Sequence, residues 1–296
     1  MHVLIAGSSG FLGSHLTSSL RRHGHTVTTL VRREARSPHE QQWDPYAGAM
    51  PPGALAGVDV VVNLAGSPTA GNPHSRAWAR ALLESRVTTT RVLAEAVAAA
   101  DHPPRFLAGN GISYYGDHGA EPLTEAAASR GDALLTEVTK AWQAATAPAS
   151  EAGAKVCVLR TAPVMDRHSP PLKQLLPVFK AGLGARLGSG TQHMPMISLR
   201  DWLGGVSFLA ESHDVGGPFN LCCPDTPTNA EFTQALADSL GRRARLAAPA
   251  WVLGRAGGRM SPELLGSVNA RPDALERAGY DFRDQDVRDV VASALG

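Results

Sequence analysis

Residues 3–16 decide the fold of this chain, and they read Val3-Leu4-Ile5-Ala6-Gly7-Ser8-Ser9-Gly10-Phe11-Leu12-Gly13-Ser14-His15-Leu16. The apolar run from residue 3 predicts a buried parallel strand, and three glycines spaced Gly-x-x-Gly-x-x-Gly lead from it into a helical pattern. Gly7 permits a tight turn, Gly10 lets the main chain approach a pyrophosphate, and Gly13 lets the helix pack closely on the sheet. The stretch therefore predicts a nucleotide-binding turn.

The start of the predicted helix supplies the donors for such a turn. The free N–H groups of a first helical turn attract an anion, and Ser8 and Ser9 add hydroxyl donors in the same loop. A glycine-rich turn before an ordinary helix is the alternative, but the position directly after a strand favours dinucleotide binding. We expect cofactor contacts from Gly7, Ser8, Ser9, Gly10, Phe11, Leu12 and Gly13.

The second predicted strand, residues 26–31, ends where a bound cofactor would place its adenosine ribose. An acidic residue at this end would accept a hydrogen bond from the 2′-hydroxyl and favour NAD. The chain instead has Arg32 and Arg33, which are donors suited to a 2′-phosphate. We therefore predict NADP, in its reduced form NADPH, as the cofactor. The alternative is a pair of solvated arginines.

The segment after this strand lacks the pattern of a regular helix. Residues 34–57 contain four prolines and several glycines, so we expect a loop with a short strand near Trp43. Residues 58–64 form the most β-branched run in the chain and predict a central strand. This strand ends in small and polar residues that would approach the cofactor, so we add these candidate contacts: Asn63, Leu64, Ala65 and Gly66.

Helices and strands alternate along the next hundred residues. The spacing of apolar residues predicts one helix over 75–100, a strand over 105–108, a helix from 132 to about 151 and a strand over 155–160. Residues 109–116, Gly-Asn-Gly-Ile-Ser-Tyr-Tyr-Gly, follow the 105–108 strand as a loop. This loop would lie at the carboxyl edge of the sheet, where open α/β sheets bind their ligands.

This alternation predicts an α/β fold, a Rossmann-type doubly wound parallel sheet followed by a smaller C-terminal substrate-capping lobe. In the second half, proline and glycine interrupt the pattern, and we expect a strand near 219–221, a helix capped by Asn229 and a last helix over 287–295. The predicted domains are an NADP-binding Rossmann domain at 1–162, the capping lobe at 163–248, interleaved with the sheet, and a helical appendage at 249–296.

Composition restricts the possible partners. The 296 residues carry a formal net charge of +1, which gives no electrostatic reason to expect nucleic acid or an anionic membrane. No apolar run approaches bilayer length, and the first strand leaves no room for a signal peptide, so we expect a soluble, cytoplasmic protein. Three cysteines predict no disulfide framework, and the eleven histidines match no metal-binding motif. Both a monomer and a homodimer remain open.

Ordered motifs along nearly the whole chain resemble the extended and atypical short-chain dehydrogenase/reductase superfamily. More narrowly, they resemble its NAD-dependent epimerase/dehydratase-like subgroup with a short C-terminal appendage of the DUF1731 type. Besides the glycine motif and Asn63-Leu64-Ala65-Gly66, the matching stretches are Trp43-Asp44-Pro45, Ser85-Arg86-Val87, Tyr114-Tyr115-Gly116, Leu159-Arg160-Thr161, Gly188-Ser189-Gly190 with Gln192, and Gly217 to Phe232. The resemblance implies nucleotide binding more specifically than it implies one reaction.

The superfamily resemblance implies a Ser-Tyr-Lys arrangement, with Tyr and Lys four residues apart on one helix. Lys140 fits the lysine position and would hold the nicotinamide ribose, but the tyrosine position is Thr136, whose hydroxyl is far too weak an acid. At the serine position stands Asn110, which orients a carbonyl but carries no hydroxyl. Tyr114 and Tyr115 are therefore the candidate proton donors, or both rings pack the loop against the sheet.

Three functions follow from these residues. The first is an NADP-dependent oxidoreductase or epimerase that acts on a small carbonyl or hydroxyl compound. The second is a non-redox enzyme, a lyase or cyclase that reuses the cleft, and the third is a cofactor-sensing protein without turnover.

Two arginines in apolar surroundings, Arg86 and Arg160, predict buried or half-buried ion pairs. We expect both to be structural. The alternative for Arg86 is a contact with the substrate.

Overall fold

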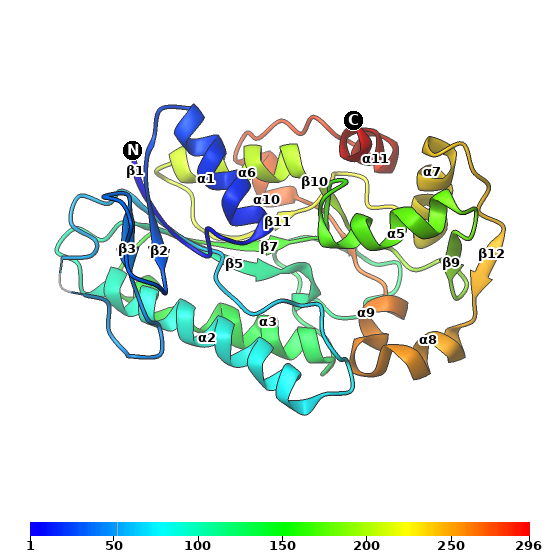
Figure 1. The fold of residues 1–296 in the computed structure, drawn as a ribbon, viewed down its shortest axis with the longest axis horizontal. Helices are drawn as coiled ribbons and strands as arrows, with labels where there is room; N and C mark the ends of the chain where they lie inside the picture. The colour runs from blue at the N-terminus through cyan, green and yellow to red at the C-terminus, as the bar shows by residue number, and fades with distance from the viewer. Residues whose placement is uncertain (52) are drawn as a thin grey trace. The chain divides into compact units, whose positions relative to one another are not determined.

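The computed structural model describes residues 1–51 and 53–296, so Pro52 of the proline-rich loop lies outside the described residues. Its main feature is a seven-stranded parallel sheet with the strand order β11-β7-β5-β4-β1-β2-β3 (Figure 1). The α/β fold expected from the alternation of strands and helices is confirmed, together with a smaller C-terminal region. None of the helices among the described residues is long and apolar enough to cross a bilayer.

The chain divides into two compact units, and it passes between them several times. The first unit comprises residues 1–110, 138–159 and 206–218, and the second comprises 111–137, 160–205 and 219–296. These two units describe compactness, and the division into three domains with boundaries at 162 and 248 stays a prediction.

The first half of the sheet forms from the strands and helices that the sequence predicts. The most β-branched run becomes β4, which is fully buried and stands in the middle of the strand order. Helices α1 and α2 cover opposite faces of the sheet in this unit (Figure 1). The elements here are β1 His2–Ala6, α1 Phe11–Arg22, β2 Thr26–Val31, β3 Glu40–Gln42, β4 Val60–Asn63, α2 Arg76–Ala98 and β5 Arg105–Gly111.

Apolar side chains hold α2 against one face of this sheet. Leu93 and Val97 of α2 are fully buried and share one core cluster with Leu4 of β1, Val61 of β4 and Phe106 of β5. Since burial of each such side chain contributes about 1.5–3 kcal/mol, this layer fixes the loops at the carboxyl ends of the strands.

The predicted helix over 132–151 is wrong in one respect, because it is two helices, α3 Leu134–Ala144 and α4 Ala147–Glu151. Pro148 is the reason, since a proline ring clashes with the carbonyl group four residues earlier, here that of Ala144. Thr146 closes the first helix with a hydrogen bond from its hydroxyl to the Gln143 carbonyl at 2.8 Å.

The second half of the chain contains short elements, as the proline and glycine pattern predicts. They are η1 Ile112–Tyr114, β6 Pro122–Leu123, β7 Val156–Thr161, β8 Val164–Met165, α5 Pro170–Lys180, β9 Ala185–Leu187, β10 Ile197–Ser198, α6 Leu199–Glu211, β11 Gly217–Leu221, α7 Asn229–Ser239, β12 Leu246–Ala248, α8 Ala250–Gly257, η2 Gly258–Met260, α9 Ser261–Leu265, β13 Asn269–Ala270, α10 Asp273–Arg277 and α11 Val287–Leu295.

The cap of α7 is Thr228, so the expectation that Asn229 caps this helix is wrong. The Thr228 hydroxyl accepts a hydrogen bond from the Glu231 amide at 3.3 Å, and the Glu231 carboxylate accepts one from the Thr228 amide at 2.7 Å. This reciprocal capping box satisfies two helix-end donors. The Asn229 side chain instead accepts a hydrogen bond from the Leu187 amide at 2.7 Å.

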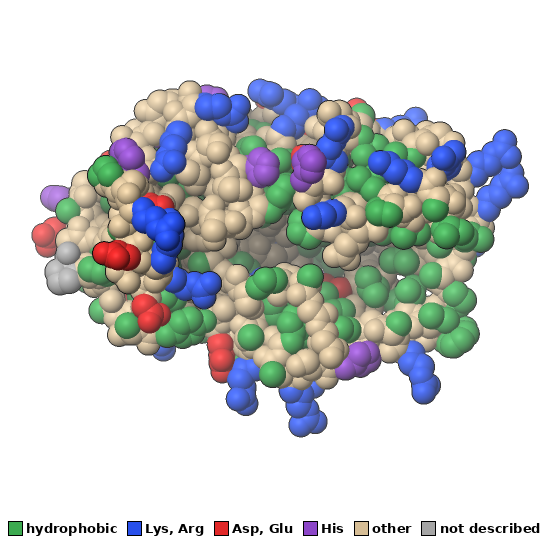
Figure 2. All heavy atoms as spheres, viewed as in Figure 1, with side chains coloured by type: hydrophobic (Ala, Val, Ile, Leu, Met, Phe, Trp, Pro, Cys, Tyr) green, Lys and Arg blue, Asp and Glu red, His purple; other side chains and the backbone are tan. Residues whose placement is uncertain are grey.

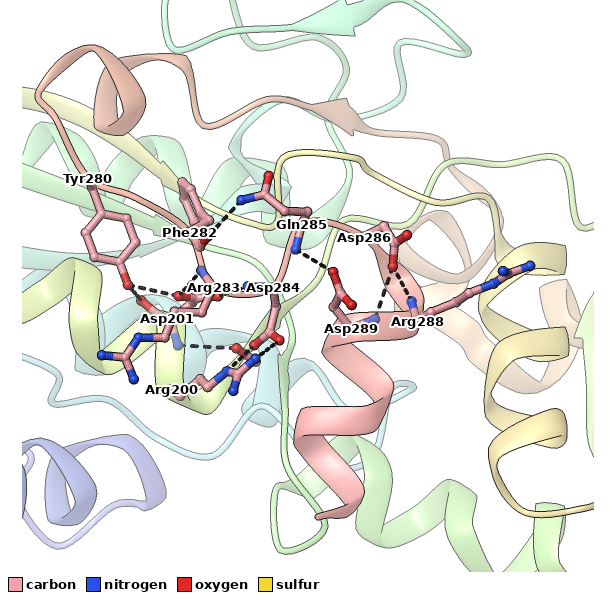
Figure 3. A network of polar contacts seen from close by, with 11 residues as sticks. Arg200, Asp201, Tyr280, Phe282, Arg283, Asp284, Gln285, Asp286, Arg288 and Asp289 are labelled. Carbon is pink, nitrogen blue, oxygen red and sulfur yellow. Dashed lines mark hydrogen bonds and ion pairs between the residues drawn. The ribbon is translucent and has the colours of Figure 1, made fainter.

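A buried carboxylate ties the last part of the second unit together (Figure 3). Asp201 is 1 % exposed, and its two oxygens accept hydrogen bonds from the Tyr280 hydroxyl at 3.0 Å, the Arg283 amide at 3.0 Å and the Asp284 amide at 2.8 Å. The neighbouring Arg200 forms an ion pair with the buried Asp284. The segment after Tyr280 is thus held by one side chain.

We therefore predict that Asp201→Asn destabilises the protein by about 2–3 kcal/mol, because an NH₂ group replaces an acceptor opposite a backbone donor. Urea unfolding followed by circular dichroism measures this change. The matched control is Asp214→Asn at an exposed position. Equal stability of both variants would contradict the role of the Asp201 network.

Candidate nucleotide-binding site

The glycines of the first loop occupy positions where the backbone leaves little space. Gly7 has φ +84°, and a Cβ there would lie 2.6 Å from the carbonyl carbon of Leu64. A Cβ on Gly13 would overlap the carbonyl oxygen of Gly7. These two glycines are therefore required by the fold itself.

Gly10 differs from its two neighbours in the motif. A Cβ there would meet only one atom within 4 Å, the Gly7 carbonyl oxygen at 3.4 Å, which is an ordinary contact. Gly10 is also the N-cap residue of α1, and the first turn of this helix contains no acidic residue. The amides of Phe11, Leu12 and Gly13 cannot reach an acceptor within their own helix and lie at its positive end. The space in front of Gly10 thus suits an anion.

A cavity of about 730 Å³ opens beside this loop within the first unit. Its volume falls in the usual range of small-molecule sites. Of the residues that the sequence singles out, the loop contributes Gly7, Ser8 and Ser9, the end of β2 contributes Arg32 and Arg33, and the end of β4 contributes Ala65 and Gly66. The sequence did not point to the following lining residues as contacts: Thr29, Leu30, Val31, Glu40, Trp43, Pro45, Tyr46, Ser67, Pro68, Ser85 and Thr89.

Two of these unexpected lining residues could have been recognised from their spacing in the sequence. Ser85 and Thr89 are polar residues four apart on the buried face of α2. Such spacing places both on one side of a helix, where polar groups among apolar ones indicate a ligand or a buried hydrogen bond. Here the Ser85 hydroxyl accepts a hydrogen bond from the Ser67 amide at 2.9 Å, so it also holds the loop that lines the cavity.

The two arginines at the end of β2 have different surroundings. Arg33 forms a bidentate ion pair with Glu40, with nitrogen to oxygen distances of 2.6 and 2.9 Å. Arg32 is exposed, and the structure gives its side chain no hydrogen bond or ion pair within the described residues. Arg32 is therefore the cation of the pair that is available to an anionic ligand.

Glu40 remains ionised beside these arginines. Hydrogen bonds from Arg33 and from the Arg36 amide, the latter at 2.8 Å, lower the pKa of the Glu40 carboxyl to about 2. The pair between Glu40 and Arg33 thus persists at neutral pH. It fixes the segment that follows Arg32.

The end of β4 is held by a buried amide. Asn63 is 0 % exposed, donates to the Thr90 hydroxyl at 2.8 Å and accepts a hydrogen bond from the Ala65 amide at 3.0 Å. Asn63 and Leu64 do not line the cavity, whereas Ala65 and Gly66 do. The contacts of Asn63 shape the loop, and its predicted contact with the cofactor stays a prediction.

The ion pair expected for Arg86 is wrong. Its guanidinium donates to the Ser67 carbonyl at 3.1 Å and to the Thr69 hydroxyl at 3.3 Å, and it lies 5.1 Å from the centre of the Trp142 ring. No carboxylate among residues 1–51 and 53–296 pairs with it. Burial without a counter-charge lowers the pKa of Arg86 to about 10. Carbonyl oxygens and an aromatic face therefore replace the carboxylate.

Two of the four candidate catalytic residues lie in the first unit. Asn110, 5 % exposed at the end of β5, donates to the Thr139 carbonyl at 3.1 Å, which places it beside the helix turn that carries Lys140. Lys140 is exposed on α3, and Thr136 is buried one turn earlier on the same helix. The predicted spacing of Thr136 and Lys140 on one helix is thus confirmed.

The two tyrosines lie in the second unit around Arg160. The Tyr115 hydroxyl donates to the Asn220 side chain at 2.8 Å and accepts a hydrogen bond from Arg160 at 2.8 Å. The Arg160 guanidinium also stacks over the Tyr114 ring at 3.6 Å. Tyr115 is 0 % exposed, and burial raises its pKa to about 12 despite the nearby Arg160. Tyr114 is only partly buried.

A second cavity of about 380 Å³ adjoins the same loop within the second unit. Ser113 lines it and donates to the Glu263 carboxylate at 2.7 Å. Burial raises the pKa of Glu263. Sequence patterns did not single out this pair, because its members lie 150 residues apart.

Metal-binding geometry is not observed in the part of the chain that the structure describes. No group of three His, Cys, Asp or Glu side chains there lies close enough together to hold an ion. The cysteines, Cys157, Cys222 and Cys223, are all buried and free.

Two family models match this chain. The model of the NAD dependent epimerase/dehydratase family matches residues 3–222, and the model of a domain of unknown function (DUF1731) matches residues 248–294. Among curated proteins, Epimerase family protein Mb2239 of Mycobacterium bovis is 39% identical over 99% of this chain and 96% of its own length. Epimerase family protein SDR39U1 of Mus musculus is 32% identical over 99% of this chain and 100% of its own length.

Solved structures show the same similarity. Human epimerase family protein SDR39U1 (isoform 2), crystallised with NADPH, superposes with a TM-score of 0.89 at 29% identity and covers 99% of both chains. A nucleoside-diphosphate sugar epimerase from Corynebacterium glutamicum superposes with a TM-score of 0.81 at 32% identity, over 99% of this chain and 58% of that one.

Proposed function

This chain belongs to the NAD dependent epimerase/dehydratase family and has a C-terminal DUF1731 domain, and from this premise we propose that it binds NADP(H) as an oxidoreductase or epimerase. Its substrate is a small carbonyl or hydroxyl compound. The observation that carries the proposal is the cavity beside the glycine loop, with Gly7, Ser8 and Ser9 of that loop and Arg32 along its wall. The NADPH in the crystals of human SDR39U1 supports the same cofactor.

The residues of the cavity, together with the first turn of α1 that follows the glycine loop, fit the parts of such a cofactor. The amides of Phe11, Leu12 and Gly13 bind the pyrophosphate, since the bare backbone at Gly10 allows it to approach. Arg32 binds the 2′-phosphate of the adenosine ribose by charge-assisted hydrogen bonds. Glu40 holds Arg33 beside it, so the two guanidinium groups do not both face the ligand.

When bound, the nicotinamide ring accepts or donates a hydride at its C4 atom. Around that chemistry, Lys140 binds the nicotinamide ribose, and Asn110 orients the substrate carbonyl through the donor and acceptor of its amide. Tyr114 moves the proton. Tyr115 is less suited to this step, because its hydroxyl already has two partners and burial holds its pKa near 12.

The second candidate is a protein that binds the cofactor without redox turnover. The observation in its favour is Thr136, a buried alcohol on α3 at the position where the superfamily places its tyrosine acid. Only a substrate assay separates the two candidates. NADPH absorbance is followed at saturating cofactor with panels of aldehydes, ketones and sugars, and the sugars are also analysed by NMR for epimerised products, because an epimerase returns the hydride and consumes no cofactor. The absence of both NADPH oxidation and an epimerised product favours the second candidate.

For the wild-type protein, we expect NADPH to raise the melting temperature more than NADH. A ligand at about one hundred times its Kd stabilises the native state by about 2.7 kcal/mol, which corresponds to a shift of roughly 5–10 °C here. Differential scanning fluorimetry with both cofactors at equal concentration measures the difference. Equal shifts would contradict a role for Arg32, and no shift with either would contradict cofactor binding altogether.

A further inference from the structure

Charge is distributed very unevenly along this nearly neutral chain. Residues 167–200 and 239–262, both in the second unit, contain ten Lys and Arg and no Asp or Glu. The rest of the chain has 18 Lys and Arg against 27 Asp and Glu. One of the ten cations, Arg200, is paired with Asp284, which leaves nine. The net charge of +1 therefore hides a strongly basic region.

Backbone contacts bring these two segments together. Strand β9 pairs in parallel with β12, with Ala185 opposite Leu246. The Arg242 guanidinium donates to the Lys180 carbonyl at 2.8 Å, and the Gly188 amide donates to the Ala248 carbonyl at 2.8 Å. These contacts bring parts of both segments into one region, formed by α5, β9, residues 242–245, β12 and α8, which we name the basic apolar surface.

Large apolar side chains are exposed on the same surface. Seven large hydrophobic residues are exposed among the described residues, and five of them lie in these two segments. They are Val178 at 44%, Leu183 at 58%, Leu246 at 49%, Trp251 at 76% and Val252 at 38% exposure. Helix α8, with the sequence Ala-Trp-Val-Leu-Gly-Arg-Ala-Gly, has no buried residue at all. This concentration exceeds the scatter of single apolar residues on an ordinary surface.

Figure 2 shows positive charge and exposed apolar side chains on one face of the molecule. Hydrophobic side chains gather over β9, β12 and α8, Lys and Arg side chains lie at the borders of this area, and no acidic side chain is visible within it. A surface of this kind combines apolar contact with attraction to negative charge.

We propose that the basic apolar surface docks on the headgroup layer of an anionic lipid membrane. Arginines such as Arg242, Arg243 and Arg245 contact the lipid phosphates, while Trp251 and its aliphatic neighbours enter the boundary between headgroups and acyl chains. Tryptophan is enriched at this depth of a bilayer because its ring is apolar and its N–H is polar. Docking in this manner is peripheral and involves no membrane-spanning segment.

Other occupants match the surface less well. A symmetric dimer through it would oppose cations with cations, since the same patch meets itself across a two-fold axis. Nucleic acid offers phosphates to the arginines but no apolar layer for Leu183, Leu246 and Val252. The expectation that no anionic membrane binds this chain came from the net charge, which does not register how charges are grouped.

Vesicle flotation of the full chain tests this proposal. The protein is mixed with vesicles of phosphatidylcholine alone or of phosphatidylcholine with phosphatidylglycerol as the minority lipid. We expect flotation only with the anionic vesicles, and we expect salt to weaken it because added ions screen the arginines.

Substitutions locate the contact. The triple change Arg242→Gln, Arg243→Gln and Arg245→Gln weakens partitioning about a hundredfold, since each cation near an anionic leaflet contributes about fivefold. Trp251→Ser, at an exposed position, weakens it about tenfold with little effect on folding. The matched control changes three exposed arginines of α2, Arg76→Gln, Arg80→Gln and Arg91→Gln, and leaves flotation unchanged.

The flotation results either support or overturn docking on an anionic membrane. Salt-sensitive flotation that is lost in the triple variant of Arg242, Arg243 and Arg245 and in Trp251→Ser, but kept in the α2 triple variant, supports the proposal. Absence of flotation with both vesicle types overturns it, and so does equal loss in the two triple variants. A larger species in light scattering that Trp251→Ser abolishes, without flotation, assigns the surface to a second copy instead.

Discussion

Gly10→Val is expected to abolish NADPH binding while the protein remains folded. The valine side chain would project from the N-cap of α1 into the space where the pyrophosphate approaches the helix amides. Losing two or more charge-assisted hydrogen bonds, each of about 1.5–3 kcal/mol, weakens binding at least about a hundredfold. Titration calorimetry of the wild type and the variant measures the change.

The other glycines of the motif provide the control for this variant. A Cβ at Gly10 meets only one atom at van der Waals distance, whereas a Cβ at Gly13 overlaps the carbonyl group of Gly7. Gly13→Ala should therefore lower the melting temperature without any ligand, and Gly10→Val should not. Undiminished NADPH affinity in Gly10→Val would show that the loop is only a turn.

Arg32→Asp is expected to reverse the cofactor preference. The wild type should bind NADPH more tightly than NADH, because Arg32 has no protein partner among the described residues and is free to bind the 2′-phosphate. In the variant, a carboxylate repels that phosphate and accepts a hydrogen bond from the 2′-hydroxyl of NADH. We expect a loss of about a hundredfold for NADPH and a gain of up to about tenfold for NADH.

The neighbouring arginine Arg36 serves as the control, since Arg36→Asp makes the same change of charge at a position outside the cavity lining. Arg36→Asp should leave the ratio of the two dissociation constants within about threefold of the wild type, because Arg36 is exposed and does not line the cavity, so solvent and salt screen its charge. If both variants shift the ratio equally, the effect is one of general charge and not a contact of Arg32.

The architecture of the first half of the chain could be predicted because its signals are local. The β-branched run at 60–63 became the central strand, and the apolar spacing before residue 100 became α2, with Ser75 accepting a hydrogen bond from the Trp78 amide as its N-cap. Two expectations about helices farther along the chain were wrong, namely one unbroken helix after residue 132 and a helix cap at Asn229. Each depended on a single residue. Pro148 ends the first helix and Thr228 caps the other one, and the spacing of apolar residues carries no information on either effect.

The candidate site could be predicted only in part. The glycine motif and Arg32 carry their signal in the sequence, because the backbone geometry of that turn requires these residue types. The partner of Arg86 could not be predicted. Its apolar sequence surroundings indicated a carboxylate, but in the structure it contacts carbonyl groups and the Trp142 ring. Nothing in the spacing of residues distinguishes these two ways to satisfy a buried cation.

The amino-acid sequence by itself determined the α/β architecture, the glycine-rich turn after the first strand and the arginine at the end of the second strand, because each rests on residues close together in the chain. Only the tertiary structure decided that Glu40 occupies Arg33 and leaves Arg32 available, and that Ser113 meets Glu263. It also decided that β9 pairs with β12, which brings together two distant segments that carry cations and exposed apolar side chains. Ser113 and Glu263 lie 150 residues apart, and even the short span from Arg33 to Glu40 closes only because β2 pairs with β3, so the packing of the chain selects these contacts.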